Sequence, residues 1–215
     1  MRTHIELENT HNHVLPLEFQ DYDVRYSESL VEYFLQEYTR EKDIVFDPFA
    51  GFGTTLMVAE SMGRIPYGIE YDEDRVHYIR TKLKQPDHII HGDSCQLLSY
   101  NLPSFNFSIT SPPYMSKYDK ENPFTAYSTI GKGYQAYLND IQVIYEKMAQ
   151  LMANDSTVII EVANIKKRGY ITTLAWDIAT RISQLLKFEG EVIVKWDNYG
   201  GGYDHSYCMV YTKPS

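Results

Sequence analysis

The sequence predicts an α/β fold in which a mostly parallel β-sheet carries helices on both faces. Strand-like apolar runs alternate with helix-like periodic segments along the chain, an order typical of parallel sheets. The length of 215 residues suits one domain with a sizeable core. The composition, with 43% hydrophobic and 23% charged residues, is ordinary for a globular protein.

The first half of the chain supplies helices and strands in turn. Helices are predicted from apolar residues three or four positions apart, and strands from short apolar runs. Ser27 is a good N-cap for the first helix, and a glycine-rich turn follows the first strand. The predicted elements are a helix at 27–39, a strand at 43–49, a helix ending near 62, a strand at 65–70, a helix around 76–83, and strands at 88–91 and 105–110.

A long loop, Met115–Ala136, interrupts the alternation and contains three tyrosines, one of them Tyr127. A loop of about 22 residues is usually functional or mobile. The last two predicted strands are joined through Gly200-Gly201-Gly202, which indicates an antiparallel hairpin at the edge of the sheet. The elements after the loop are a helix at 137–152, a strand at 157–163, a helix at 171–186, and strands at 191–196 and 207–212.

Acidic residues are concentrated in the first half of the chain. Residues 1–102 hold 9 basic and 18 acidic side chains, whereas residues 103–215 hold 11 of each. The net charge of −9 is unfavourable for contacts with nucleic-acid phosphates. In the second half, Lys117, Lys120 and Lys132 surround the long loop, and Lys166-Lys167-Arg168 form a basic run. For that run, a solvated turn and a phosphate contact both stay open.

No membrane span, disulfide framework or metal site is predicted. No stretch approaches the roughly 20 apolar residues of a transmembrane helix, and the polar first residues do not resemble a signal peptide. Cys95 and Cys208 fit a reducing compartment. The tripeptide His11-Asn12-His13 matches a tripeptide found in some nucleases, but no residues around it have the spacing of metal ligands. We expect a cytoplasmic protein.

A ligand site is predicted at the glycine-rich turn, because ligands of open α/β sheets bind beyond the carboxyl ends of the strands. Glycines there let the backbone approach a ligand. Acids follow three successive strands: Asp47 for a ligand ammonium, Glu70 for ribose hydroxyls and Asp93 for an adenine amino group. A dinucleotide is disfavoured, because the third glycine of Gly-x-Gly-x-x-Gly is missing. The candidate cofactor-binding residues are Asp47, Phe49, Ala50, Gly51, Gly53, Thr54, Glu70, Asp93 and Ser94.

The fourth strand ends in Thr110-Ser111-Pro112-Pro113-Tyr114. This motif fits methylation of a base amino group, whose nitrogen is a poor nucleophile because its lone pair is delocalised. The Ser111 hydroxyl and the Pro112 carbonyl can accept its two N–H bonds and free the lone pair. The prolines hold those acceptors rigid, and Tyr114 offers a face for base stacking. We therefore take Ser111, Pro112, Pro113 and Tyr114 as the candidate catalytic residues.

The combination of Asp47–Thr55, Glu70 and Thr110–Tyr114 resembles the amino-methyltransferases of DNA, which make N4-methylcytosine or N6-methyladenine. The resemblance covers nearly the whole chain, from about Ser27 to Thr212. It implies a Rossmann-like class I methyltransferase fold with a seven-stranded sheet, an antiparallel final strand, and S-adenosylmethionine (SAM) as cofactor. It also implies that Ser27–Tyr38 packs on the methionine part of SAM. Serine in the Pro-Pro-Tyr motif is most similar to the N4-cytosine enzymes.

The expected substrate is therefore a DNA base that is flipped out or already single-stranded. Residues 1–215 are expected to form one catalytic domain, since site-specific members of the family carry a domain-sized recognition region that this chain lacks. Methylation of adenine N6, of RNA or of a protein amide stays open. So do a non-catalytic role as a cofactor-binding subunit, a homodimer, and a partner chain that supplies target recognition. Membership of a restriction–modification system is also compatible with this reading.

Overall fold

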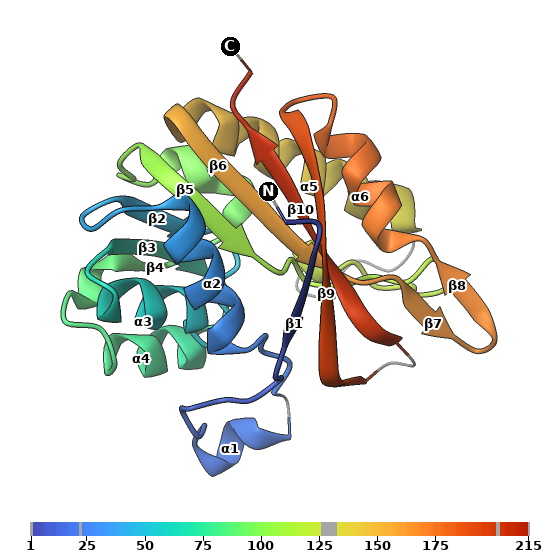
Figure 1. The fold of residues 1–215 in the computed structure, drawn as a ribbon, viewed down its shortest axis with the longest axis horizontal. Coiled ribbons are helices and arrows are strands. Elements are labelled where there is room, and N and C mark those ends of the chain that lie inside the picture. Colours follow the sequence, from blue (N-terminus) through green and yellow to red (C-terminus); the bar gives the residue numbers. More distant parts are fainter. Residues whose placement is uncertain (1, 22, 126–132, 201–202, 215) are drawn as a thin grey trace.

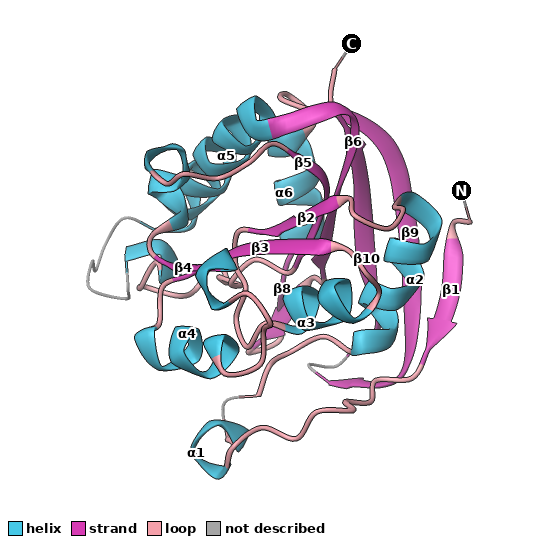
Figure 2. Ribbon diagram, turned by 90° about the vertical axis from the view of Figure 1, so that its left-hand side faces the viewer, coloured by secondary structure: helices cyan, strands magenta, loops and turns pink. Residues whose placement is uncertain are grey.

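The computed structural model describes residues 2–21, 23–125, 133–200 and 203–214. At its centre is an eight-stranded sheet with the order β1-β9-β10-β6-β5-β2-β3-β4 (Figures 1 and 2). The strands of this sheet are β1 (His4–Leu7), β2 (Ile44–Asp47), β3 (Ile65–Glu70), β4 (Ile89–His91), β5 (Phe105–Thr110), β6 (Met152–Val162), β9 (Lys187–Gly200) and β10 (Tyr203–Thr212). A separate hairpin consists of β7 (Ile165–Lys167) and β8 (Tyr170–Thr172).

Helices connect these strands and lie on both faces of the sheet. The α-helices are α1 (Leu17–Gln20), α2 (Glu28–Tyr38), α3 (Thr54–Ser61), α4 (Glu73–Arg80), α5 (Gly133–Leu151) and α6 (Leu174–Ile182). The short 3₁₀ helices are η1 (Pro86–His88), η2 (Ser94–Ser99) and η3 (Pro123–Thr125). In Figure 1, α1 lies apart from the two helical layers, below the sheet. Among the described residues, no helix combines the length and apolar character needed to cross a membrane.

The strand directions confirm the predicted sheet. Strands β2, β3, β4, β5 and β6 run parallel to one another, whereas β10 pairs antiparallel with both β6 and β9. The eighth strand, β1, was not predicted, and it pairs in parallel with β9 at the sheet edge. Its apolar residues are only Ile5, which is buried, and Leu7, an alternation too short to predict a strand. The sheet therefore contains the expected seven strands and one short edge strand.

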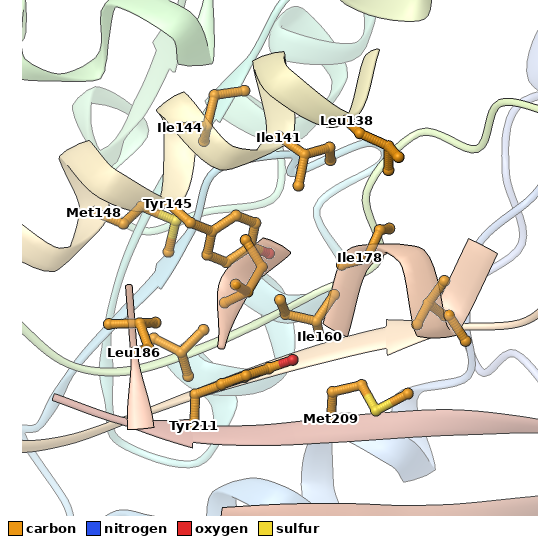
Figure 3. Packing of buried hydrophobic residues seen from close by; sticks show 14 of the residues in the cluster. Leu138, Ile141, Ile144, Tyr145, Met148, Ile160, Ile178, Leu186, Met209 and Tyr211 are labelled. Carbon is orange, nitrogen blue, oxygen red and sulfur yellow. The ribbon is translucent and has the colours of Figure 1, made fainter. Parts of the chain in front are cut away.

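Alternate side chains of the strands face the two helical layers, as the pleat of a strand dictates. On one face, Ile160 of β6 and Met209 of β10 pack against α5 and α6 (Figure 3). On the other face, Ile159 and Val210 belong to the layer formed with α2 and α3. These buried apolar layers fix the strand ends, and thereby the positions of the residues that follow them.

Two predicted helices have different bounds in the structure. Helix α5 begins at Gly133, and not near Tyr137. Helix α6 begins at Leu174, and not at Ile171, because the residues before Leu174 form the β7–β8 hairpin. Trp176, in α6, is 43% exposed. Helix α6 buries the stripe that contains Leu174 and Ile178, so Trp176 faces outward and packs on Tyr207.

The segment His11–His13 binds the start of α2. Glu28, which is buried, accepts hydrogen bonds from the backbone N–H groups of Asn12 (3.2 Å) and His13 (3.4 Å), and the His11 ring lies 3.7 Å from it. Burial opposes ionisation of Glu28. The hydrogen bonds from His11, the Glu28 backbone, Asn12 and His13 outweigh it and lower the pKa to about 2. The tripeptide thus anchors the N-terminal segment.

We predict that Glu28→Gln lowers the free energy of unfolding by about 3 kcal/mol at neutral pH. A depressed pKa in the folded state stabilises the protein above the unfolded-state pKa of 4.5. That contribution is lost as the pH falls towards 2, so the difference between wild type and variant should shrink on acidification. Urea unfolding from about pH 7 to about pH 3 measures it. Glu32→Gln, on the exposed side of α2, is the control, and a pH-independent difference for Glu28→Gln would contradict the prediction.

Candidate active site

A cleft of about 1,340 Å³ lies at the carboxyl ends of the parallel strands. It is bounded by the glycine-rich turn after β2, by the ends of β3 and β6, and by the residues that follow β4 and β5. The predicted site residues that line it are Phe49, Ala50, Gly51, Thr54, Glu70, Asp93, Ser94, Ser111, Pro112, Pro113 and Tyr114. The structure thus brings the two predicted motifs to one cavity. Asp47 and Gly53 do not line it.

The two glycines of the turn have backbone conformations that side chains disfavour. Gly51 has φ of 57° and Gly53 has φ of 81°, both in the left-handed region. A Cβ atom at Gly53 would lie 2.9 Å from Ile79 Cγ1. The close approach that requires glycine at position 53 is therefore to Ile79 of α4.

Asp47 is buried and has its partners within the protein. Its carboxylate accepts hydrogen bonds from the Thr110 hydroxyl (2.6 Å), the Phe49 N–H (2.9 Å) and the Tyr26 hydroxyl (3.4 Å). Burial raises the pKa of Asp47, and these hydrogen bonds oppose the rise. Asp47 does not line the cleft, and its role towards a ligand ammonium stays a prediction. This residue joins the end of β2 to the end of β5.

Glu70, at the end of β3, lines the cleft with a carboxylate that is held in place. One oxygen accepts the Gly51 N–H at 2.8 Å, and the other accepts the Asp72 N–H at 2.9 Å. Burial raises the pKa of Glu70. A carboxylate has about four lone-pair sites, so Glu70 can accept further hydrogen bonds from two adjacent hydroxyl groups.

Asp93 and Ser94 form the wall of the cleft beyond β4. Asp93 caps the η2 turn by accepting the Cys95 N–H at 2.8 Å with one carboxylate oxygen. Ser94 is buried, and its hydroxyl donates to the Pro48 carbonyl of the glycine-rich turn. Ser94 therefore joins the residues after β4 to the turn after β2. Asp93 presents a carboxylate to the cleft.

The Ser111–Tyr114 segment leaves β5 directly after Thr110, whose hydroxyl is bound to Asp47. The Tyr114 hydroxyl accepts the Ala163 N–H at 2.7 Å and lies 3.5 Å from a carboxylate oxygen of Glu161. The aromatic ring is therefore held between the ends of β5 and β6. Ser111 lines the cleft and is only partly buried, so its side chain is accessible from the cavity.

Several cleft residues were missed by sequence reasoning. Glu161, at the end of β6, is 2% exposed and lies beside Tyr114. A single acid after the apolar run Val158–Ile160 was the available signal. The segment Asp23–Tyr26, together with Asn9 and His11, also lines the cleft. These residues lie outside regular structure, and no periodic pattern marks them.

The loop tyrosines have separate environments. Tyr118 is half-exposed, with its ring 5.1 Å from that of Tyr170. Tyr134 is buried and donates to Asp177 at 2.9 Å, so it packs the start of α5. Tyr127, together with Lys132 and the glycines 201 and 202, lies outside the described residues. Within the described part of the chain, no group of three His, Cys, Asp or Glu side chains is arranged to hold a metal ion.

The fold is that of Rossmann-like SAM-dependent methyltransferases. TrmN from Thermus thermophilus superimposes with a TM-score of 0.63 at 15% identity, covering 87% of this chain and 49% of that chain. An rRNA methylase from Streptococcus thermophilus superimposes with a TM-score of 0.59 at 13% identity, covering 90% of this chain and 99% of that chain. The magnesium protoporphyrin IX methyltransferase of Synechocystis, with bound SAM, superimposes with a TM-score of 0.57 at 14% identity. The match covers 87% of this chain and 77% of that chain. The predicted fold class is confirmed.

The resemblance to the amino-methyltransferases of DNA is confirmed over part of the chain by two sequence matches. The N6_N4_Mtase family, described as DNA methylase, matches residues 3–81. The Type II methyltransferase M.BglII of Bacillus subtilis is 38% identical over 66 residues, which are 31% of this chain and 18% of that protein. The chain thus spans about half the length of TrmN and aligns with a small part of M.BglII.

We predict that Gly53→Ala lowers the free energy of unfolding by about 2–4 kcal/mol, because the methyl group adds a clash with Ile79 to the strain of a left-handed backbone. Gly63→Ala is the matched control, since Gly63 has φ of 80° and its nearest neighbour, a Glu41 side-chain carbon, would be 3.5 Å from the added Cβ. That control should lose only about 1–2 kcal/mol. Equal losses in urea unfolding would show that contact with α4 is not what requires glycine at position 53.

Proposed function

We propose that this chain is a SAM-dependent methyltransferase that acts on an exocyclic amino group of a nucleic-acid base, with N4 of cytosine in DNA as the leading target. One observation carries the proposal: a single cleft contains both the strand-end acids Glu70 and Asp93 and the Ser111–Tyr114 segment. A site for an adenosine-type cofactor and a site for a planar amino group are thereby adjacent.

The acidic end of the cleft fits SAM. Glu70 offers acceptors for two ribose hydroxyls, Asp93 offers one for an adenine amino group, and the turn at Phe49–Gly51 offers backbone close to the ligand. The carboxylates of Glu70, Asp72 and Asp93 also suit a ligand that carries ammonium and sulfonium charges. When bound, SAM supplies an electrophilic methyl group.

The other end of the cleft activates the amino group. The Ser111 hydroxyl and the Pro112 carbonyl accept its two N–H bonds, which withdraws the lone pair from the ring and turns it towards the methyl donor. They also stabilise the positive charge that develops on nitrogen before a proton leaves. Tyr114 holds the base by stacking. Its hydroxyl is fixed by the Ala163 N–H, so the ring keeps one orientation.

The preference for cytosine rests on the resemblance of Ser111 to the serine of N4-cytosine enzymes. The runner-up is the same transfer to adenine N6, since the matching DNA methylase family is described by both positions. Transfer to RNA is supported by the likeness of the fold to an rRNA methylase. A base in a duplex must leave the helix to reach Ser111, so single-stranded substrates should react fastest.

We predict that the purified chain transfers tritium from methyl-labelled SAM to single-stranded DNA, and that Ser111→Ala reduces kcat at least about 100-fold, because one acceptor of the amino group is lost. S-adenosylhomocysteine should bind the variant as it binds the wild type. Ser99→Ala, an exposed serine outside the cleft, is the control. Mass spectrometry of digested DNA identifies the modified base.

Absence of label on DNA, RNA and protein alike would overturn the proposed function. Label on RNA or protein alone would keep the chemistry and replace the substrate. Full activity of Ser111→Ala would remove that residue from the mechanism.

We predict that affinity for S-adenosylhomocysteine falls on acidification at a higher pH than an ordinary glutamate would cause. Burial raises the pKa of Glu70, so its carboxylate is protonated earlier and then accepts hydroxyl hydrogen bonds poorly. Calorimetry between about pH 8 and about pH 5 measures the effect. Glu70→Gln should bind more weakly and with a flatter pH profile, whereas Glu73→Gln, also at the cleft, should retain the wild-type profile. Identical profiles for all three proteins would refute the ribose assignment.

A further inference from the structure

The β7–β8 hairpin forms the edge of the cleft on the side of Ser111–Tyr114. It lies outside the main sheet and extends beyond α6 (Figure 1). Its turn contains Arg168 and Gly169, with φ of 54° and 82°. Ile165 and Lys166, in its first strand, line the cleft. A ligand that leaves the cleft on this side therefore passes over the hairpin.

The hairpin is attached to the residues that directly follow the catalytic motif. Thr172, which is buried, accepts the Lys117 N–H at 3.1 Å, and its hydroxyl lies 3.4 Å from that of Ser116. Lys167 forms an ion pair with Asp119. These contacts fix the hairpin relative to Tyr114, two residues before Ser116. A group bound on the hairpin would therefore be held at a fixed distance from the base in the cleft.

The surface formed by residues 117–120 and 166–171, here called the hairpin surface, is basic. It carries Lys117, Lys120, Lys166, Lys167 and Arg168 in a chain whose net charge is −9. Lys167 pairs with Asp119 and Lys117 with Asp177. Over the described ranges, no ion pair within 4.0 Å involves Lys120, Lys166 or Arg168. These three cations are available to an anionic ligand.

The hairpin surface also exposes aromatic rings. Tyr118 and Tyr170 are 50% and 61% exposed, and their ring centroids are 5.1 Å apart with an angle of 40° between the planes. Cations beside exposed aromatic rings are typical of surfaces that bind single-stranded nucleic acid, because phosphates pair with the cations and bases stack on the rings. A protein partner would gain from the exposed Ile171, but the unpaired cations favour a polyanion.

We propose that the hairpin surface binds the single-stranded nucleic-acid segment next to the target base. This inference rests on the proposed function, and it names where the polymer lies. Lys120, Lys166 and Arg168 contact phosphates, and Tyr118 with Tyr170 stacks on a neighbouring base. Such contacts do not read sequence, so the surface supplies affinity for the strand and positions its target base, with little discrimination between sites.

The test compares Lys166→Gln/Arg168→Gln with the matched control Arg40→Gln/Lys84→Gln, which removes the same two charges from exposed positions away from the cleft. Fluorescence anisotropy measures binding of a labelled single-stranded DNA of about 12 nucleotides at several salt concentrations. The hairpin variant should bind at least about tenfold more weakly, and the slope of log K against log salt should fall by about 1.4. The control should bind as the wild type does.

The aromatic contribution is tested by Tyr170→Ala, which should weaken binding about tenfold, and by Tyr170→Phe, which should retain it, since stacking needs the ring and not the hydroxyl. An RNA of the same length should behave like the DNA, because both offer phosphates and bases. S-adenosylhomocysteine should bind every variant equally, which shows that each is folded.

The outcomes separate this inference from the proposed function. If wild type transfers methyl groups to nucleic acid and the hairpin variants match it in affinity and salt slope, the inference is wrong and the proposed function stands. If wild type neither binds nor methylates any nucleic acid, both fail. If the variants lose affinity for a protein substrate and not for nucleic acid, the surface is a protein interface.

Discussion

The buried hydrogen bond between Asp47 and Thr110 is the constraint on which the site depends. It joins the last residue of β2 to the last residue of β5, at 2.6 Å and out of contact with the cleft. The glycine-rich turn begins immediately after one of these residues, and Ser111 immediately after the other. A displacement of either strand end would separate the two parts of the cleft. Burial of a carboxylate is costly, and three hydrogen bonds to Asp47 offset part of that cost.

The cleft is electrically asymmetric. Glu70, Asp72 and Asp93 lie at the end formed by β3 and the residues after β4, whereas the end formed by β6 and the hairpin combines the buried Glu161 with Lys166 and adjoins the other cations of the hairpin surface. A cationic small ligand would therefore be attracted to the acidic end of the cleft, and an anionic polymer to the hairpin surface beside the other end. The net charge of −9 does not reveal the basic hairpin surface. Overall charge is thus a poor guide to the ligands of this chain, and the distribution of charge along the sequence is a better one.

The sheet and the two motifs that meet in the cleft were predictable because their signals are local. A buried strand is a short apolar run, and the acids at 70 and 93 follow such runs directly. What the sequence could not show depends on distant residues. The edge strand β1 exists through its pairing with β9, and the β7–β8 hairpin has exposed side chains with no alternating apolar pattern. The hydrogen-bond partners of Asp47 were not predictable either, because strand-end position does not reveal which way a carboxylate turns. Its partner Thr110 is 63 residues away.

One N-terminal segment covers the edge of the sheet and also lines the cleft. Strand β1 covers residues 193–196 of the 14-residue strand β9, and the chain then passes along the cleft, where Asn9 and His11 line it, before Glu28 anchors it at α2. An uncovered strand edge is a template for pairing with other chains. Detachment of this one segment would therefore open the cleft and, at the same time, expose an unpaired edge of β9 to other chains. Evolution or engineering that loosens the segment to speed ligand exchange must also protect the molecule against self-association.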